Sequence, residues 1–367
     1  MRTITMIAFL TFSGTLIAQD TITLFACHKQ AFENAPRLND RDFIRQIGEL
    51  KVENASYNWY PTLELNGKLS YQSDVVTVAL TDPTIPVAFP EVPHDQYGLN
   101  LDISQTLYDG GITKQKKNYE QAIVAADLQQ VEVDLYGLKA RVNRFYFAIL
   151  VLQESRKNLE IHMQNLVNRH EIMKLAIQEC TLLEAELKVI DVEVLKVRQS
   201  MLEIDSRKKS YIGALTLLCG DEYNEGVHLE KPELDRFMGK EYSRPEYQWF
   251  DLKDASMEAG KELIGKKRMP VLYAFGQTGY GKPGYNMMSE EWDYYYMVGA
   301  GLRWNIWDWN NNNRDRQVIE QQQHILRNQR ATFDKEIESL KVQEEAKMEQ
   351  FRKSMELEEQ VLELQED

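Results

Sequence analysis

The 367-residue sequence has few cysteines, and they follow no framework. Cys27, Cys180 and Cys219 are too few for a disulfide scaffold and lack zinc-ligand spacing. Basic residues are outnumbered, 43 against 57 acidic ones, and a net charge of −14 argues against a nucleic-acid partner, because phosphate binding needs a basic surface. No apolar run reaches the roughly 20 residues that a conventional membrane-spanning helix needs. Composition alone is typical of a soluble acidic protein of two or three domains.

Proline and glycine are scarce over long spans. Residues 94–231 contain no proline, and Gly137 is the only glycine between 112 and 212. Because both residues interrupt helices, we expect an antiparallel hairpin with arms at about 112–178 and 182–218, roughly 100 Å and 55 Å long at about 1.5 Å per residue. A further helix is expected over 37–58. The apolar stripe alternates steps of three and four, the coiled-coil spacing, at Leu128, Val131, Leu135, Leu138, Val142, Phe145, Ile149 and Leu152 in the first arm and at Leu187, Ile190, Val194, Val197, Met201, Ile204, Tyr211, Leu215 and Leu218 in the second.

Motifs for catalysis or cofactor binding are also missing. The sequence has no GxGxxG or P-loop pattern and no readable Ser/His/Asp arrangement. His162 and His170 are eight residues apart, but no third metal ligand accompanies them. The many carboxylates of 334–367 are best explained as a solvated helical face. We therefore predict no enzyme activity, no cofactor and no metal.

The N-terminus indicates export. A basic start at Arg2, an apolar stretch over 4–17 and the small residue Ala18 form a signal-peptide pattern, with cleavage expected after Ala18. The alternative is an ordinary N-terminal strand or helix. Residues 24–27, Leu-Phe-Ala-Cys, resemble a lipoprotein cleavage box, but Asp20 separates them from the apolar run. We expect Cys27 to be a helix-packing cysteine, and its lipidation stays open.

Two segments alternate polar and apolar residues as strands do. Over 62–72 and 97–108, apolar and polar side chains fall on opposite faces, and the loop between them carries four prolines within 82–94. In an exported protein, such alternation suits an outer-membrane barrel with lipid outside and water inside.

The same pattern occurs again later in the chain. Tyr60-Pro61-Thr62-Leu63 is answered by Met269-Pro270-Val271-Leu272, and Leu107-Tyr108-Asp109-Gly110-Gly111 by Ile306-Trp307-Asp308-Trp309-Asn310. The second copy predicts a strand over 296–306, and aromatic residues gather at the strand ends as in a membrane interface. The alternative is a soluble sandwich with an aromatic surface patch, but a duplicated order of helix, hairpin and long helix favours the barrel.

In this order of elements the sequence resembles TolC-like outer-membrane efflux proteins. The resemblance covers about 20–367. It is carried by Tyr60-Pro61-Thr62-Leu63, by the strand end Ile103-Ser104-Gln105-Thr106-Leu107-Tyr108-Asp109-Gly110-Gly111, by Arg244-Pro245-Glu246, and by Asp95-Gln96-Tyr97 after a proline-bearing loop, as in Bacteroidetes-type members.

The resemblance implies an α+β fold with internal duplication: a long antiparallel coiled-coil α-helical barrel, and four strands per chain in a twelve-stranded transmembrane β-barrel shared by a homotrimer. It implies a Gram-negative outer-membrane location with a periplasmic extension. The implied partners are a periplasmic adaptor protein, an inner-membrane pump and outer-membrane lipid. In this family the pump selects the cargo, so no substrate is implied.

The implied site is the channel lining together with the tip of the first helical hairpin. Water-facing positions would be Asn100, Asp102, Ser104, Arg303 and Asn305, and lipid-facing ones Leu99, Leu101, Ile103, Val298 and Leu302. The adaptor-contacting tip would be Gln178, Glu179, Cys180, Thr181 and Leu182, where Cys180 stands in place of the family's usual glycine.

The sequence departs from the family near its C-terminus. By analogy with the first hairpin, the second tip would fall beyond Asp367, so the second return helix is missing and the gate residues cannot be assigned. The expected divisions are a signal peptide (1–18), N-terminal periplasmic helices (19–59), a first transmembrane β-hairpin (60–109), a first long helical hairpin (110–220), an equatorial linker and helix (221–268), a second transmembrane β-hairpin (269–309) and an incomplete second long helix (310–367).

The leading hypothesis is a passive outer-membrane exit duct for efflux or type I secretion. Two alternatives stay open. One is a periplasmic coiled-coil scaffold, and the other is a truncated, non-conducting relic of the channel.

Overall fold

The computed structural model describes residues 21–76, 92–179, 181–224, 226–232, 244–287 and 289–366. The predicted signal peptide and most of the proline-bearing loop lie outside these residues. The chain divides into two compact units: one is made of Met1–Asp40 and Val131–Ser243, the other of Arg41–Gln130 and Arg244–Asp367. Because α3 (Ile112–Gln178) runs across the boundary, it contributes its first turns to the second unit and the remainder to the first.

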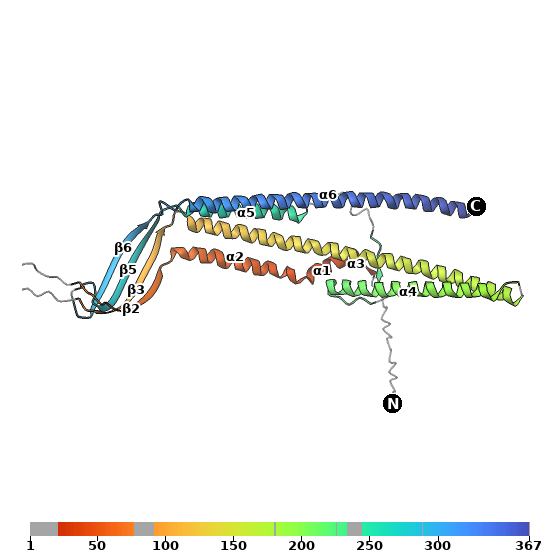
Figure 1. The fold of residues 1–367 in the computed structure, drawn as a ribbon, viewed down its shortest axis with the longest axis horizontal. Coiled ribbons are helices and arrows are strands. Elements are labelled where there is room, and N and C mark those ends of the chain that lie inside the picture. Colours follow the sequence, from red (N-terminus) through yellow and green to blue (C-terminus); the bar gives the residue numbers. More distant parts are fainter. Residues whose placement is uncertain are drawn as a thin grey trace, which may run out of the picture. The chain divides into compact units, whose positions relative to one another are not determined.

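The second unit contains a four-stranded antiparallel sheet, whose strands lie side by side in Figure 1. The strands are β2 (Thr62–Tyr71), β3 (Asp95–Tyr108), β5 (Val271–Lys282) and β6 (Asp293–Arg303), in the order β2-β3-β5-β6. Each predicted hairpin therefore forms, and β3 of the first pairs with β5 of the second.

The helices of this unit are α2 (Asp40–Ser56), the short η2 (Tyr57–Trp59), the first part of α3, α5 (Pro245–Lys266) and α6 (Asn311–Glu366). Helix α5 lies alongside α6 (Figure 1). Phe250 and Tyr247 of α5 stack against Phe333 of α6, with ring centroids 5.9 and 5.5 Å apart. Gly260 allows α5 to approach the first part of α3 closely, because a Cβ at this position would lie 3.0 Å from the ring of Tyr119 on α3.

The first unit is a three-helix arrangement around an apolar core. It contains β1 (Thr21–Ile22), α1 (Leu24–Glu33), η1 (Pro36–Leu38), the remainder of α3, α4 (Glu184–Cys219) and β4 (His228–Leu229), which pairs in parallel with β1. The predicted antiparallel hairpin forms from α3 and α4 (Figure 1), and Thr23 caps α1 by accepting a hydrogen bond from the Ala26 amide.

The core of this unit is broader than the predicted two-helix stripe. Val142 and Ile149 are buried as predicted, but Tyr146 is also fully buried, whereas Phe145 is only partly covered. In α4, Ile212 is buried beside Leu215, so the stripe is shifted by one residue there. The cause is α1, whose Leu24, Cys27 and Ala31 cover a second face of the hairpin. Cys27 is fully buried in this core, which confirms the prediction that it is a helix-packing cysteine.

Candidate functional site: a sheet with one polar and one apolar face

The polar face of the sheet is organised around one carboxylate. Asp102 on β3 accepts hydrogen bonds from Asn66 on β2, from Asn100 on its own strand and from Gln277 on β5, each at 2.6 Å. The register explains this convergence, because Glu64 and Gln277 lie directly across from Asp102 and Asn66 from Asn100. The network thus joins three of the four strands through side chains as well as through the backbone.

Aromatic rings cover glycines elsewhere on the same face. Tyr273, Phe275 and Tyr295 each lie over a glycine of the neighbouring strand, respectively Gly301, Gly299 and Gly279. A Cβ at any of these glycines would lie 2.4 to 2.7 Å from the ring above it, so only glycine leaves room. Arg303 also lies over the Tyr273 ring, with its guanidinium carbon 5.3 Å from the centroid. Because each ring lies over a glycine, it packs against the backbone of the neighbouring strand. The pattern of residues along each strand did not predict these contacts.

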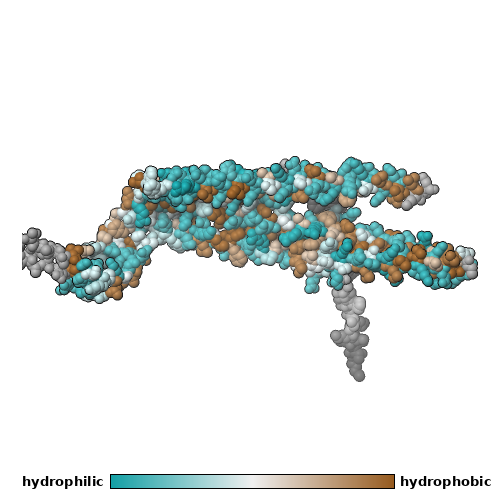
Figure 2. Space-filling model, viewed as in Figure 1, coloured by the Kyte–Doolittle hydropathy of each residue, from teal (hydrophilic) through white to brown (hydrophobic). Residues whose placement is uncertain are grey.

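The opposite face is apolar and exposed. Leu63 opposes Ile103, Leu65 opposes Leu101 and Leu272 opposes Leu302 in the ladder, so leucine-rich positions line up across strands. Leu65 is 69% and Val298 77% exposed in the single chain. An exposed leucine surface of this size marks contact with lipid or with another protein. Figure 2 shows such apolar residues over the strands, among hydrophilic ones.

Both edges of the sheet are open in the single chain. In the described residues, β2 pairs only with β3 and β6 pairs only with β5, so each has one row of backbone groups without a strand partner. Long open edges are rare in isolated proteins, because they template pairing with another strand.

Aromatic residues gather at both ends of the strands. At the end near the hairpin loops, Trp292 lies against Tyr97 and Tyr280, with ring centroids 5.6 and 5.3 Å apart. At the end near the helices, Trp307 and Trp309 stack edge-on at 5.9 Å. Two aromatic belts separated by an apolar band are typical of a membrane-spanning sheet.

The sheet places four of the five predicted water-facing residues on the polar face. Asn100, Asp102 and Ser104 follow one another on β3, and Arg303 shares their face at the end of β6. Strand β6 ends at Arg303, before the predicted end at 306, so Asn305 lies just beyond the strand and its water-facing position stays a prediction. The strand ends there because Arg303 pairs with Val271, and the preceding Pro270 has no N–H to continue the ladder.

The tip of the first helical hairpin is a short turn between α3 and α4. Thr181 closes it by donating its amide (3.0 Å) and its hydroxyl (2.8 Å) to the Ala176 carbonyl. Gln178, Glu179 and Thr181 are exposed, and Leu182 is half-buried. Cys180 lies outside the described residues.

A matching turn follows the last strand of each hairpin. Asp109 accepts the amides of Gly111 (2.9 Å) and Thr113 (2.7 Å) at the start of α3. Asp308 accepts those of Asn310 (3.0 Å) and Asn312 (3.1 Å) at the start of α6. The duplication predicted from the sequence therefore extends to the hydrogen bonds of both turns.

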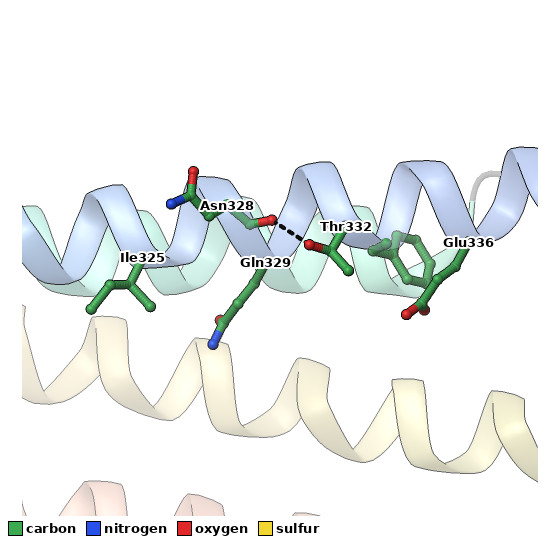
Figure 3. A pocket seen from close by; sticks show the side chains of 6 residues that line it. Ile325, Asn328, Gln329, Thr332 and Glu336 are labelled. Carbon is green, nitrogen blue, oxygen red and sulfur yellow. Dashed lines mark hydrogen bonds between the residues drawn. The ribbon is translucent and has the colours of Figure 1, made fainter.

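One pocket lies along the surface of α6. It has a volume of about 330 Å³ and is lined by Ile325, Asn328, Gln329, Thr332, Phe333 and Glu336 (Figure 3). All six come from one helix, where Thr332 bonds to the Asn328 carbonyl, so this is a groove along a helix face and not a converging site. Within the described residues, no metal-ligand cluster is present, and no helix is both long and apolar enough to cross a membrane.

Comparison with solved structures places this architecture among outer-membrane channels. The outer-membrane protein VceC of Vibrio cholerae aligns with a TM-score of 0.60 at 12% identity, over 83% of this chain and 74% of VceC. The CmeC outer-membrane channel of Campylobacter jejuni gives 0.58 at 13% identity, over 83% of this chain and 66% of CmeC. The open-state MtrE channel of Neisseria gonorrhoeae gives 0.56 at 15% identity, over 83% and 68%. No family model and no curated protein matches the sequence.

The fold is therefore similar to that of these outer-membrane proteins, with long helices joined to a four-stranded antiparallel sheet. More specifically, it is TolC-like, as the sequence predicted. The outer-membrane location expected from the sequence agrees with the location of these neighbours.

Proposed function

We propose that the chain is the outer-membrane subunit of a tripartite efflux or type I secretion system and acts as a passive exit duct. The observation that carries this proposal is the sheet itself: one face polar, one face apolar, and both edges open. In lipid, an open edge leaves backbone groups without partners, so a four-stranded sheet must be completed by other strands.

A homotrimer satisfies this requirement. Three copies supply twelve strands, with β2 of one copy meeting β6 of the next. The network around Asp102, together with Ser104 and Arg303, then faces water inside the barrel, and the leucine face meets lipid. The hairpins of 60–109 and 269–309 are the transmembrane parts, and the helical segments extend into the periplasm.

We assign the contact with a periplasmic adaptor to the tip of the helical hairpin. At its tip, the polar side chains of Gln178, Glu179 and Thr181 are exposed at the end of a long helical pair. A periplasmic adaptor that reads this turn would couple the duct to an inner-membrane pump. The solved neighbours are channels, which favours a duct over a periplasmic scaffold or a non-conducting relic.

The test exploits two neighbouring residues on opposite faces of β2. Leu65→Arg places a charge on the lipid face near the strand centre, at a cost of about 2–4 kcal/mol per copy near the bilayer midplane. Glu64→Arg is the matched control, because Glu64 lies across from Asp102 on the polar face. We expect heat-modifiable trimer in outer-membrane fractions to be lost in Leu65→Arg and kept in Glu64→Arg.

Equal effects of the two substitutions would contradict the assignment of the faces. A high-salt wash without detergent separates the scaffold alternative, since a peripheral scaffold would leave the membrane and a barrel would stay.

A further inference from the structure

Two cysteines far apart in the sequence meet in the core of the first unit. Cys27 lies in the middle of α1 and Cys219 is the last residue of α4, 192 residues later. Their exposures are 0% and 4%. The Cys219 thiol lies 3.6 Å from the Cys27 carbonyl oxygen, to which it donates, and the two thiols are also hydrogen-bond partners of each other.

Several independent contacts fix this meeting point. Asn34, just after α1, donates to the Leu218 carbonyl at 3.3 Å. Gln30 of α1 donates to Asp221 at 2.5 Å and accepts from the Tyr223 hydroxyl at 2.6 Å. The end of α4 and the segment after it are thus attached to the second half of α1 and its cap on both sides of Cys219, by contacts that do not involve the two sulfur atoms.

Glycine at position 220 makes this approach possible. Gly220 caps α4 in the left-handed region with φ +80°, and a Cβ there would lie 2.7 Å from the Asn34 side chain. The backbone beside Cys219 therefore packs directly on the end of α1.

We propose that Cys27 and Cys219 form a disulfide bond in the exported protein, which cross-links α1 to the end of α4. The proposal rests on the proposed function, because an outer-membrane subunit folds in the oxidising periplasm, where such bonds form and persist. In a reducing compartment, the same pair would stay as two buried thiols.

The two thiols differ in acidity once the core has closed. Hydrogen bonding from Cys27 lowers the pKa of Cys219 to about 7 although burial opposes it, and the Tyr223 hydroxyl lowers it further. Hydrogen bonding to Cys219, together with burial, raises the pKa of Cys27.

The reaction is an exchange with a periplasmic protein that donates a disulfide. The thiolate of one cysteine attacks one sulfur of the donor, forming a mixed disulfide and releasing the donor's other sulfur as a thiolate. The second cysteine then loses its proton and attacks the sulfur of the first, expelling the donor's bound sulfur. The two cysteines lose two electrons and two protons, and the donor disulfide is reduced to a dithiol. Both cysteines are buried after folding, so the exchange precedes closure of the core.

The experiment counts free thiols in the full-length chain after it has been expressed from its own gene and exported. A Cys180→Ser background leaves only Cys27 and Cys219. Cells are quenched in acid, and the denatured protein is alkylated with a polyethylene-glycol maleimide, with or without prior reduction. We expect no adduct without reduction and two adducts after it. Adding Cys27→Ser or Cys219→Ser to the same background should give one adduct under both conditions, and mass spectrometry should find the two cysteine-containing peptides linked.

Two adducts on the unreduced, exported chain would overturn the disulfide. Fractionation of the same cells tests the proposed function separately. If a high-salt wash removes a cross-linked chain from the membrane, the proposed channel function is contradicted while the proposed disulfide is supported. If the chain is not exported, the reduced protein is refolded with oxidised glutathione. Formation of the 27–219 link then supports the pairing, and its failure to form overturns it.

Discussion

Single residues determine how each strand passes into its long helix. Gly110 and Gly111 take up left-handed conformations after β3 (φ +66° and +87°), and the equivalent Trp309 and Asn310 do the same after β6 (φ +52° and +64°). The turn is therefore required by the fold, since the second copy keeps it although Trp309 is a residue type that rarely adopts positive φ. The sequence alignment of the two copies predicted the equivalence but not the conformation.

Alanine substitutions at Gly110 and Gly111 distinguish the cost of backbone strain from the cost of a side-chain clash. A Cβ at Gly111 would meet nothing within 4 Å, so Gly111→Ala should lower the unfolding free energy only by the strain of a left-handed backbone, about 1–2 kcal/mol. Gly110→Ala should cost clearly more, because its Cβ would lie 2.1 Å from the Met269 Cβ. Denaturant unfolding of the purified variants measures both, and equal losses would show that the Met269 contact does not constrain the turn.

His28 makes the first unit sensitive to acid. Its side chain is half-buried, its Nε2 lies 2.7 Å from Asn143 Oδ1, and Lys139 is nearby. Burial lowers the pKa of His28 despite the bond to Asn143, so the unfolded chain takes up a proton more readily than the folded one. Stability should therefore fall as the pH drops from about 7 to about 5, around the ordinary pKa of about 6.5. His28→Gln should flatten this part of a plot of unfolding midpoint against pH; an unchanged slope would contradict the assignment.

At the scale of elements, Tyr146 ties α3 to the two short strands. Its hydroxyl lies 2.8 Å from the Ile22 carbonyl of β1 and 2.6 Å from the Glu230 carbonyl that follows β4. The three-four stripe missed this residue, because its burial comes from elements that a two-helix pattern does not include.

Removing that hydroxyl should destabilise the protein. In Tyr146→Phe, the Ile22 and Glu230 carbonyls lose the hydroxyl that they share while the ring stays, and Ile22 still accepts from the Glu230 amide. We therefore expect a loss of about 0.5–1.5 kcal/mol in unfolding free energy. Tyr211→Phe is the control, because the Tyr211 ring stacks on Phe145 and its hydroxyl makes no hydrogen bond recorded among the described residues. Equal small losses would mean that water replaces the Tyr146 hydroxyl.

The strands show where element prediction succeeds and where it stops. Alternation of leucine with polar residues gave the faces of β2 and β3, because side chains in a strand have a strict period of two. In β5 the polar face carries Tyr273 and Phe275, which alternation alone would assign to lipid; their place became clear only with Gly301 and Gly299 across the ladder. The early end of β6 likewise depends on Pro270, which directly precedes its partner strand β5.

At the scale of the whole molecule, the charge and the hydropathy take on a different meaning. A net charge of −14 and a mean hydropathy of −0.49 are typical of soluble proteins. In a TolC-like fold they are compatible with a membrane subunit, because only one face of four strands is apolar and the long helices are hydrated. The proposed trimer follows from the open edges of that sheet, and the Leu65→Arg and Glu64→Arg pair tests it directly.

The sequence by itself determined the long helices, the four strands, the two faces of β2, β3 and β6, and the duplication, because each of these depends on local periodicity and on proline and glycine. Only the tertiary structure decided the convergence of Asn66 and Gln277 on Asp102, the aromatic rings over glycines and the meeting of Cys27 with Cys219. Those features join residues from different elements, and their positions depend on strand register and helix packing, which no single segment contains.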